Sequence, residues 1–185
     1  KDAYAEGCVL MVTWEPWNPA TQEAIDYDKV LSGGYDSYIA SFAQALKNAG
    51  GPVLIRFAHE MNGDWYPWCG KRIGKEKYIA LYRYVKDKFD AADTKNIKWV
   101  FAVNWEDVPK YDNSFKSYYP GDQYVDFIGI DGYNWGNVKS WGKWRSFKEI
   151  FEDRLNAIGK TFNKPLVVSE FGSTSSGGNK ALWIK

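Results

Sequence analysis

Two glutamates, Glu60 and Glu170, each follow a short apolar run that is typical of a buried strand. The first run covers residues 53–58, and the second, residues 166–169, leads directly into Glu170. Cleavage of a glycosidic bond requires one carboxylic acid to protonate the leaving oxygen and a second carboxylate to attack the sugar or activate water. The two glutamates could therefore hydrolyse a neutral polysaccharide, and in a retaining enzyme their carboxyl groups should lie about 5–5.5 Å apart.

Two polar residues precede Glu60 within the same stretch. Strand alternation puts Arg56 on the same side as Glu60, inside the fold, where a buried guanidinium needs a carboxylate partner such as Glu60, Glu170 or Asp131. A structural ion pair and a direct part in catalysis both remain open for Arg56. His59 is the single histidine of the chain, and its position favours a supporting role in which it orients a carboxylate or a sugar hydroxyl.

Aromatic side chains gather after the strand-like runs, and the chain contains ten tryptophans. Such side chains can stack on sugar rings, although some of them can instead pack loop against loop. Tyr133 could donate a hydrogen bond to the nucleophile. Trp99 and Trp183 fall inside a strand and a helix and are expected in the core, whereas the stacking candidates after strand ends are Trp14, Trp17, Trp65, Trp68, Trp105 and Trp135.

The elements that must position these residues alternate between strand and helix. Strand-like runs cover residues 8–13, 53–58, 97–103, 125–130 and 166–169, and helical patterns cover 35–49, 75–91, 147–162 and 179–185. A loop is expected between the first strand and residue 35. This alternation predicts an α/β fold with parallel strands, and the long aromatic loops after the strands favour a (β/α)8 TIM barrel. No glycine-rich phosphate-binding motif follows a strand, which weakens a nucleotide-binding open sheet.

Five strands are fewer than the eight of a complete barrel. We expect residues 1–185 to form a single catalytic barrel domain, incomplete at both ends and covering about strands 3 to 7, because a free five-strand piece would leave both edges unpaired. Mass spectrometry of the intact protein that found nothing beyond these residues would contradict this.

The composition limits the kind of partner. The net charge of +1 gives no electrostatic basis for binding nucleic acid or an anionic membrane, and no stretch approaches the roughly 20 apolar residues of a membrane span. Cys8 and Cys69 are expected to be free thiols, and the lack of His or Cys clusters argues against structural zinc. We expect no cofactor, and a monomer that could carry appended carbohydrate-binding modules. The size of a polysaccharide substrate indicates secretion.

Residues 56–68, Arg-Phe-Ala-His-Glu-Met-Asn-Gly-Asp-Trp-Tyr-Pro-Trp, resemble the acid/base motif of glycoside hydrolase family 26, and residues 168–172, Val-Ser-Glu-Phe-Gly, resemble its nucleophile motif. Residues 14–16, 119–121 with 125–126, and 131–133 agree with the family in order and spacing, so the resemblance covers nearly the whole chain. It implies a retaining double displacement, with Glu60 as acid/base after the fourth barrel strand and Glu170 as nucleophile after the seventh.

The resemblance also implies roles for the surrounding residues, of which Arg56, Asp131 and Tyr133 would hold the nucleophile. Glu170 should stay ionised beside Arg56 and Tyr133, while the pKa of Glu60 should be raised. The expected substrate-binding residues are His59, Arg56, Trp65, Trp68, Trp105, Asp131, Tyr133, Trp135, Trp14 and Glu15.

The substrate is less defined than the chemistry. The family includes mannanases, mixed-linkage β-glucanases and β-1,3-xylanases, and we expect an endo-β-1,4-mannanase because that activity is commonest, with a lichenase-type β-glucanase close behind. The run 65–68, Trp-Tyr-Pro-Trp, differs from the pattern associated with mannanases. A non-catalytic carbohydrate-binding barrel is an alternative, as is an enzyme that uses Glu60 as a base on a phosphorylated substrate, for which no phosphate cradle is found.

Overall fold

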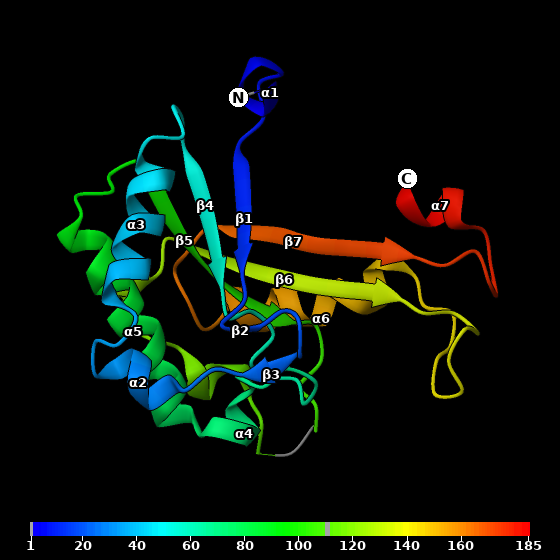
Figure 1. Ribbon diagram of the computed structural model, residues 1–185. Helices are drawn as coiled ribbons and strands as arrows, with labels where there is room; N and C mark the ends of the chain where they lie inside the picture. The colour runs from blue at the N-terminus through cyan, green and yellow to red at the C-terminus, as the bar shows by residue number, and fades with distance from the viewer. Residues whose placement is uncertain (1, 110–111) are drawn as a thin grey trace.

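The computed structural model describes residues 2–109 and 112–185. Its main feature is a parallel sheet in the order β1-β4-β5-β6-β7 (Figure 1). The five predicted apolar runs all form strands, of which β4, β5 and β6 are mostly buried, whereas β1 and β7 at the edges are mostly partly exposed. The strands β6 and β7 end later than predicted because they include the polar residues after the apolar run. The strands are β1 (Leu10–Trp14), β4 (Val53–Phe57), β5 (Ile97–Asn104), β6 (Phe127–Asn134) and β7 (Leu166–Ser173).

The three long helices lie where the apolar periodicity predicts them. They are α3 (Asp36–Lys47), α5 (Lys75–Ala91) and α6 (Phe147–Gly159). In Figure 1, α3 and α5 lie beside β1, β4 and β5, whereas α6 lies behind β6. The helix α6 begins with the expected capping box, in which the Glu149 backbone N–H donates to the Ser146 hydroxyl at 3.2 Å and the Ser146 N–H donates to the Glu149 carboxylate at 2.7 Å.

Several short elements complete the described fold, and most of them have no counterpart in the sequence prediction. The segment expected to be a loop before residue 35 contains a small hairpin and a helix, so that expectation was wrong in part. The short elements are α1 (Asp2–Ala5), β2 (Trp17–Asn18), β3 (Glu23–Ala24), α2 (Tyr27–Leu31), α4 (Gly70–Ile73), α7 (Lys180–Ile184) and the 3₁₀ helices η1 (Phe115–Tyr118) and η2 (Asp122–Tyr124). The final helix α7 agrees with the expected one.

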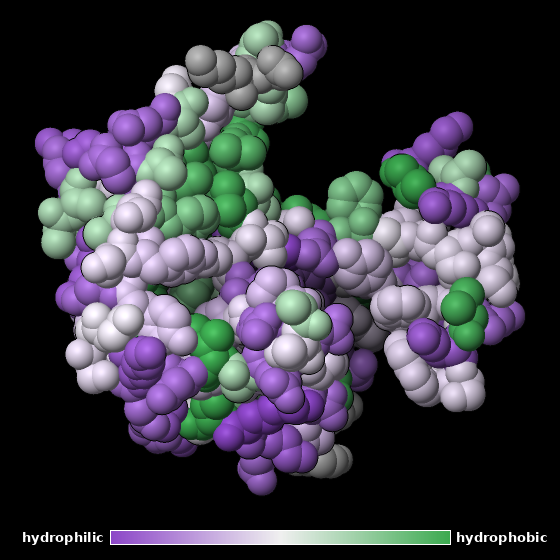
Figure 2. Space-filling view, in the orientation of Figure 1, coloured by the Kyte–Doolittle hydropathy of each residue, from purple (hydrophilic) through white to green (hydrophobic). Residues whose placement is uncertain are grey.

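The sheet is open at β1 and β7, which each pair with one neighbour among the described residues. In Figure 1 the sheet twists strongly between β1 and β7, and Figure 2 shows hydrophobic residues over the upper part of β1 and β4. A curled parallel sheet with helices outside it is part of a (β/α)8 barrel, which confirms the predicted fold class.

Strand register brings the predicted site residues to one end of the sheet. Asn104 at the end of β5 pairs with Asp131, and Asp131 pairs with Glu170 across a β-bulge between Ile130 and Asp131.

The described residues include no helix long and apolar enough to cross a membrane. Cys8 and Cys69 are free thiols, as expected.

Candidate active site

Arg56 connects four strands of the sheet at the predicted site. Its side chain, only 3% exposed, lies near the end of β4, and its Nη1 donates to the Asp131 carboxylate at 2.7 Å. Its Nη2 pairs with the Glu170 carboxylate and donates to the Thr13 hydroxyl at 2.7 Å. Asp131 and Glu170 are thus the partners of this buried cation, whereas Glu60, the third partner considered, is not.

Glu170 accepts hydrogen bonds on both carboxylate oxygens. Oε1 faces Arg56, and Oε2 accepts from the Tyr133 hydroxyl at 2.6 Å. Burial acts to raise the pKa of Glu170, but the hydrogen bonds from Tyr133 and Arg56 outweigh it and leave the pKa below its ordinary value. Glu170 is therefore an oriented, ionised carboxylate.

Asp131 completes the group around Arg56. It is fully buried and accepts a hydrogen bond from the Ser169 hydroxyl as well as the one from Arg56. Burial raises the pKa of Asp131 to about 6, against the opposing influence of Arg56 and Ser169. Asp131 thus holds the guanidinium that in turn holds Glu170.

Glu60 lies in a tight turn that follows β4. Ala58 and Glu60 have φ values of +46° and +53°, in the left-handed region that residues other than glycine rarely adopt. Hydrogen bonds from the rest of the fold fix this turn, since the Glu60 N–H donates to the Ala102 carbonyl at 2.9 Å and the Trp68 indole donates to the His59 carbonyl at 2.7 Å. The strained turn directs the Glu60 side chain into the site.

The environment of the Glu60 carboxyl group shifts its pKa in the opposite direction to the pKa of Glu170. Burial raises the pKa of Glu60 to about 8, and the negative charge of Asp131 adds to this effect, whereas a hydrogen bond of 2.8 Å from the Trp65 indole opposes it. At neutral pH Glu60 is therefore mainly protonated, and it can donate a proton.

His59 and Glu15 lie on the β1 side of the site. His59 Nε2 is 3.1 Å from the Tyr66 hydroxyl and 4.0 Å from the Glu15 carboxylate. Burial, and then the charge of Arg56, lower the pKa of His59 to about 3, so the imidazole is neutral. Burial also raises the pKa of Glu15. The predicted role of His59 in orienting a carboxylate or sugar hydroxyl stays a prediction.

His59, Asp131 and Glu170 each offer a possible metal-ligand atom, all within 4.8 Å of one another. The guanidinium of Arg56 already binds both carboxylates of this group. A metal ion would have to displace a buried cation from its partners, so the group is better described as an ion-pair cluster around Arg56.

A cavity of about 450 Å³ is lined by both glutamates and by aromatic rings. Trp65 and Trp135 are each 42% exposed, and so their rings are open to a ligand. Trp105 also lines this cavity, although the Arg145 guanidinium lies 5.1 Å from its ring centre. The aromatic residues of the cavity are Trp65, Tyr66, Trp105, Tyr133, Trp135 and Trp141.

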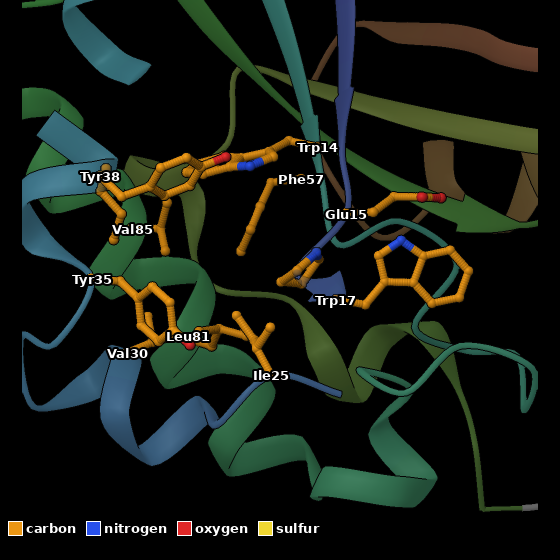
Figure 3. A pocket seen from close by; sticks show the side chains of 12 residues that line it. Trp14, Glu15, Trp17, Ile25, Val30, Tyr35, Tyr38, Phe57, Leu81 and Val85 are labelled. Carbon is orange, nitrogen blue, oxygen red and sulfur yellow. The ribbon is translucent and has the colours of Figure 1, made fainter. Parts of the chain in front are cut away.

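The expectation that Trp68 stacks on substrate was wrong, and Trp14 does not line the cavity of the two glutamates. Trp14 is the last residue of β1, and its ring packs 4.6 Å from that of Phe42 and 5.2 Å from that of Phe57. In Figure 3 Trp14 lies with Tyr38 and Phe57, while the Glu15 carboxyl group extends away from them. Trp68 is fully buried and stacks on Tyr66 at 4.2 Å. Both rings are part of the packing.

Trp141 is the main cavity residue that sequence reasoning missed. It lies in the loop between β6 and α6 and is 70% exposed. The sequence prediction covers tryptophans that closely follow a strand, and Trp141 comes seven residues after the end of β6. The signal that could have found it is its place in a long aromatic loop that follows a strand. Trp99 and Trp183 are buried, as expected for core residues.

The sequence profile of Glycosyl hydrolase family 26 matches residues 10–176. The chain belongs to this family. It is 44% identical, over 98% of its length, to Endoglucanase H of Acetivibrio thermocellus, and 31% identical, over 77% of its length, to a mannan endo-1,4-beta-mannosidase of Bacillus subtilis. The structure also resembles that of a mannanase from Bacillus subtilis, with a TM-score of 0.67 and 26% identity over 99% of the chain.

The chain spans only part of each of these proteins. It covers 20% of the endoglucanase, 36% of the mannosidase and 57% of the solved mannanase chain. The described residues thus correspond to part of a family 26 barrel.

Proposed function

We propose that this family 26 protein is a retaining endo-β-glycanase that hydrolyses a β-glucan by double displacement. The observation that carries the proposal is the contrast between two carboxyl groups in one aromatic cavity. Glu60 has a pKa raised to about 8, and Glu170 has a lowered pKa. A pair of carboxyl groups with opposite shifts suits one for proton donation and the other for nucleophilic attack.

In the first step, an oxygen of Glu170 attacks the anomeric carbon while Glu60 gives its proton to the leaving glycosidic oxygen. The bond to the leaving sugar breaks, and a glycosyl ester of Glu170 forms. In the second step, the ionised Glu60 takes a proton from water, and the resulting hydroxide displaces Glu170 from the anomeric carbon. Arg56 and Tyr133 hold the carboxylate of Glu170 in position for both steps.

The substrate proposal follows the relatives. The sequence alone favours mannan, but the identity of 44% to a protein named endoglucanase, over nearly the whole chain, exceeds the 31% identity to a named mannosidase. We therefore place a β-1,4-containing glucan, such as mixed-linkage glucan, first. β-1,4-mannan is the second candidate, because several relatives are named mannan endo-1,4-beta-mannosidases.

The test is hydrolysis of barley β-glucan, mannan, galactomannan and β-1,3-xylan by the intact protein and its Glu60→Ala and Glu170→Ala variants. Glucan should be cleaved fastest, with the β-anomer as the first product, and both variants should lose polymer cleavage. An aryl glycoside whose leaving group departs without being protonated should separate the role of the proton donor from that of the nucleophile. With this substrate Glu60→Ala should still form the glycosyl ester, and Glu170→Ala should not.

The exposed Glu152 on α6, which forms an ion pair with Lys148, provides a matched control. Glu152→Ala removes a carboxylate that does not line the cavity, and it should leave cleavage unchanged. Cleavage that survives in Glu170→Ala would refute the proposal. Polymer binding without any cleavage by the unmodified protein would instead favour the carbohydrate-binding barrel.

A further inference from the structure

We infer that Trp141 forms a distal sugar-binding platform that supports a pyranose ring of the polymer away from the bond that is cleaved. This inference rests on the proposed function and extends it to the reach of the cleft. The ligand would be one further β-linked glucosyl unit of the same chain.

Three aromatic rings lead outward from the nucleophile. Tyr133 donates to Glu170, its ring centre is 5.9 Å from that of Trp135, and Trp135 is 6.0 Å from Trp141. Trp141 lines the same cavity as the two glutamates. Among the described ring contacts Trp141 pairs with Trp135 and not with Tyr133, so the path extends away from the reacting carboxylate.

Trp141 is unusual in its exposure. A tryptophan normally buries most of its large ring, yet this one is 70% exposed and has Val138, itself 55% exposed, on the same loop. Packing within the described fold therefore does not account for the ring. An exposed aromatic ring in a mostly apolar cavity that also holds a few polar groups is typical of a ligand-binding surface.

The loop that carries Trp141 is held at both ends. The buried side-chain oxygen of Asn134 accepts hydrogen bonds from the Gly136 N–H at 3.2 Å and from the Arg145 N–H at 3.0 Å. The amide nitrogen of Asn134 donates in turn to the Ser173 hydroxyl on β7 at 2.9 Å. One side chain at the end of β6 thus closes the loop against the barrel strand that also carries Glu170.

Close approaches inside the loop limit its conformations further. Gly136 has φ of +49°, and a Cβ there would lie 2.0 Å from the Ser176 carbonyl oxygen. A Cβ on Gly142 would lie 2.6 Å from the Gly136 carbonyl oxygen. Because the loop backbone is fixed before a ligand arrives, the exposed ring can bind with little loss of conformational entropy.

The experiment measures binding by calorimetry in the Glu170→Ala background of the intact protein, with cellohexaose as the long ligand and cellobiose as the short one. Trp141→Ala should weaken the affinity for cellohexaose by about 3- to 10-fold and should affect cellobiose less. Trp141→Phe should retain most of the affinity. Equal affinities for cellohexaose with and without the Trp141 ring, or equal losses of affinity for both ligands, would overturn the inference. An unchanged affinity for both sugars would leave contact with another protein as the alternative role for the ring.

Tyr38 on α3 is a matched control, since it is 57% exposed and does not line the cavity of the two glutamates. Tyr38→Ala should leave both affinities unchanged, and thermal unfolding should show that each variant is folded. Cleavage of glucan by the unmodified protein, together with an unaltered Trp141→Ala affinity, would refute the platform alone. Neither cleavage nor binding of any sugar would refute the proposed function and the platform together.

Discussion

The hydrogen bond from Tyr133 to Glu170 makes a quantitative prediction about the acid limb of the pH profile. Tyr133→Phe removes one hydroxyl and keeps the ring. A hydrogen bond to a charged group contributes about 1.5–3 kcal/mol, and we take the lower end because Tyr133 is partly exposed. Since about 1.4 kcal/mol corresponds to one pKa unit, the pKa of Glu170 should rise by about one unit.

The sign follows from the form of Glu170 that reacts. In the proposed mechanism Glu170 must be ionised to attack, and the Tyr133 hydroxyl favours the ionised form. Tyr133→Phe should therefore move the acid limb of kcat/KM to higher pH by about one unit. The assay is hydrolysis of soluble β-glucan from about pH 3 to about pH 9. An acid limb that stays in place, or that moves to lower pH, would refute the reasoning.

The same hydrogen bond contributes to stability. A carboxylate with a lowered folded-state pKa stabilises the fold above its ordinary value of 4.5, and this contribution is lost as the pH falls through the folded-state pKa. Tyr133→Phe should therefore reduce the free energy of unfolding near neutral pH by about 1 kcal/mol, with a smaller effect in acid.

Tyr119 supplies the matched control, because its hydroxyl donates to the Asp122 carboxylate at 2.8 Å and neither residue lines the cavity. Tyr119→Phe removes an equivalent tyrosine–carboxylate hydrogen bond. Its acid limb should coincide with that of the unmodified protein. A shift of the same size in both variants would mean that the limb does not report on Glu170.

Two further substitutions test the groups around the glutamates. Trp65→Phe removes the indole donor that lowers the pKa of Glu60, so the basic limb of kcat/KM should move to higher pH by up to about one unit; a move to lower pH would contradict this. Arg56→Met leaves the buried Asp131 carboxylate without its cation, and urea unfolding should show a loss of about 3–5 kcal/mol in the free energy of unfolding. A loss below about 1 kcal/mol would show that the ion pair contributes little.

The sequence predicts the large elements of the fold because their signals are long and consistent. The helix α5 has the predicted bounds, with Tyr78, Leu81, Tyr82, Val85 and Phe89 buried on one face. The hairpin of β2 and β3 was missed because each strand has two residues, too few to show a period. Contacts with the rest of the fold, rather than local preference, determine such short elements.

For the site, chain order indicates which residues come near one end of the sheet but not where each ring points. Arg56, Asp131 and Glu170 meet as expected because strand alternation and parallel pairing determine their sides. Trp14 does not line the cavity of the two glutamates because it is still inside β1 and its ring packs against Phe42 on α3. The left-handed backbone of Glu60 could not be predicted either, since distant hydrogen bonds impose it.

The Asn134 clamp has a consequence for how the cleft can diversify. Because one buried amide closes the loop at Gly136 and Arg145, the exposed side chains of Val138 and Trp141 can change in type while the barrel strands keep their register. Side chains can thus vary on a fixed backbone beside the two glutamates, and exchanging these two positions between homologues would test whether the loop contributes to the proposed choice of polymer.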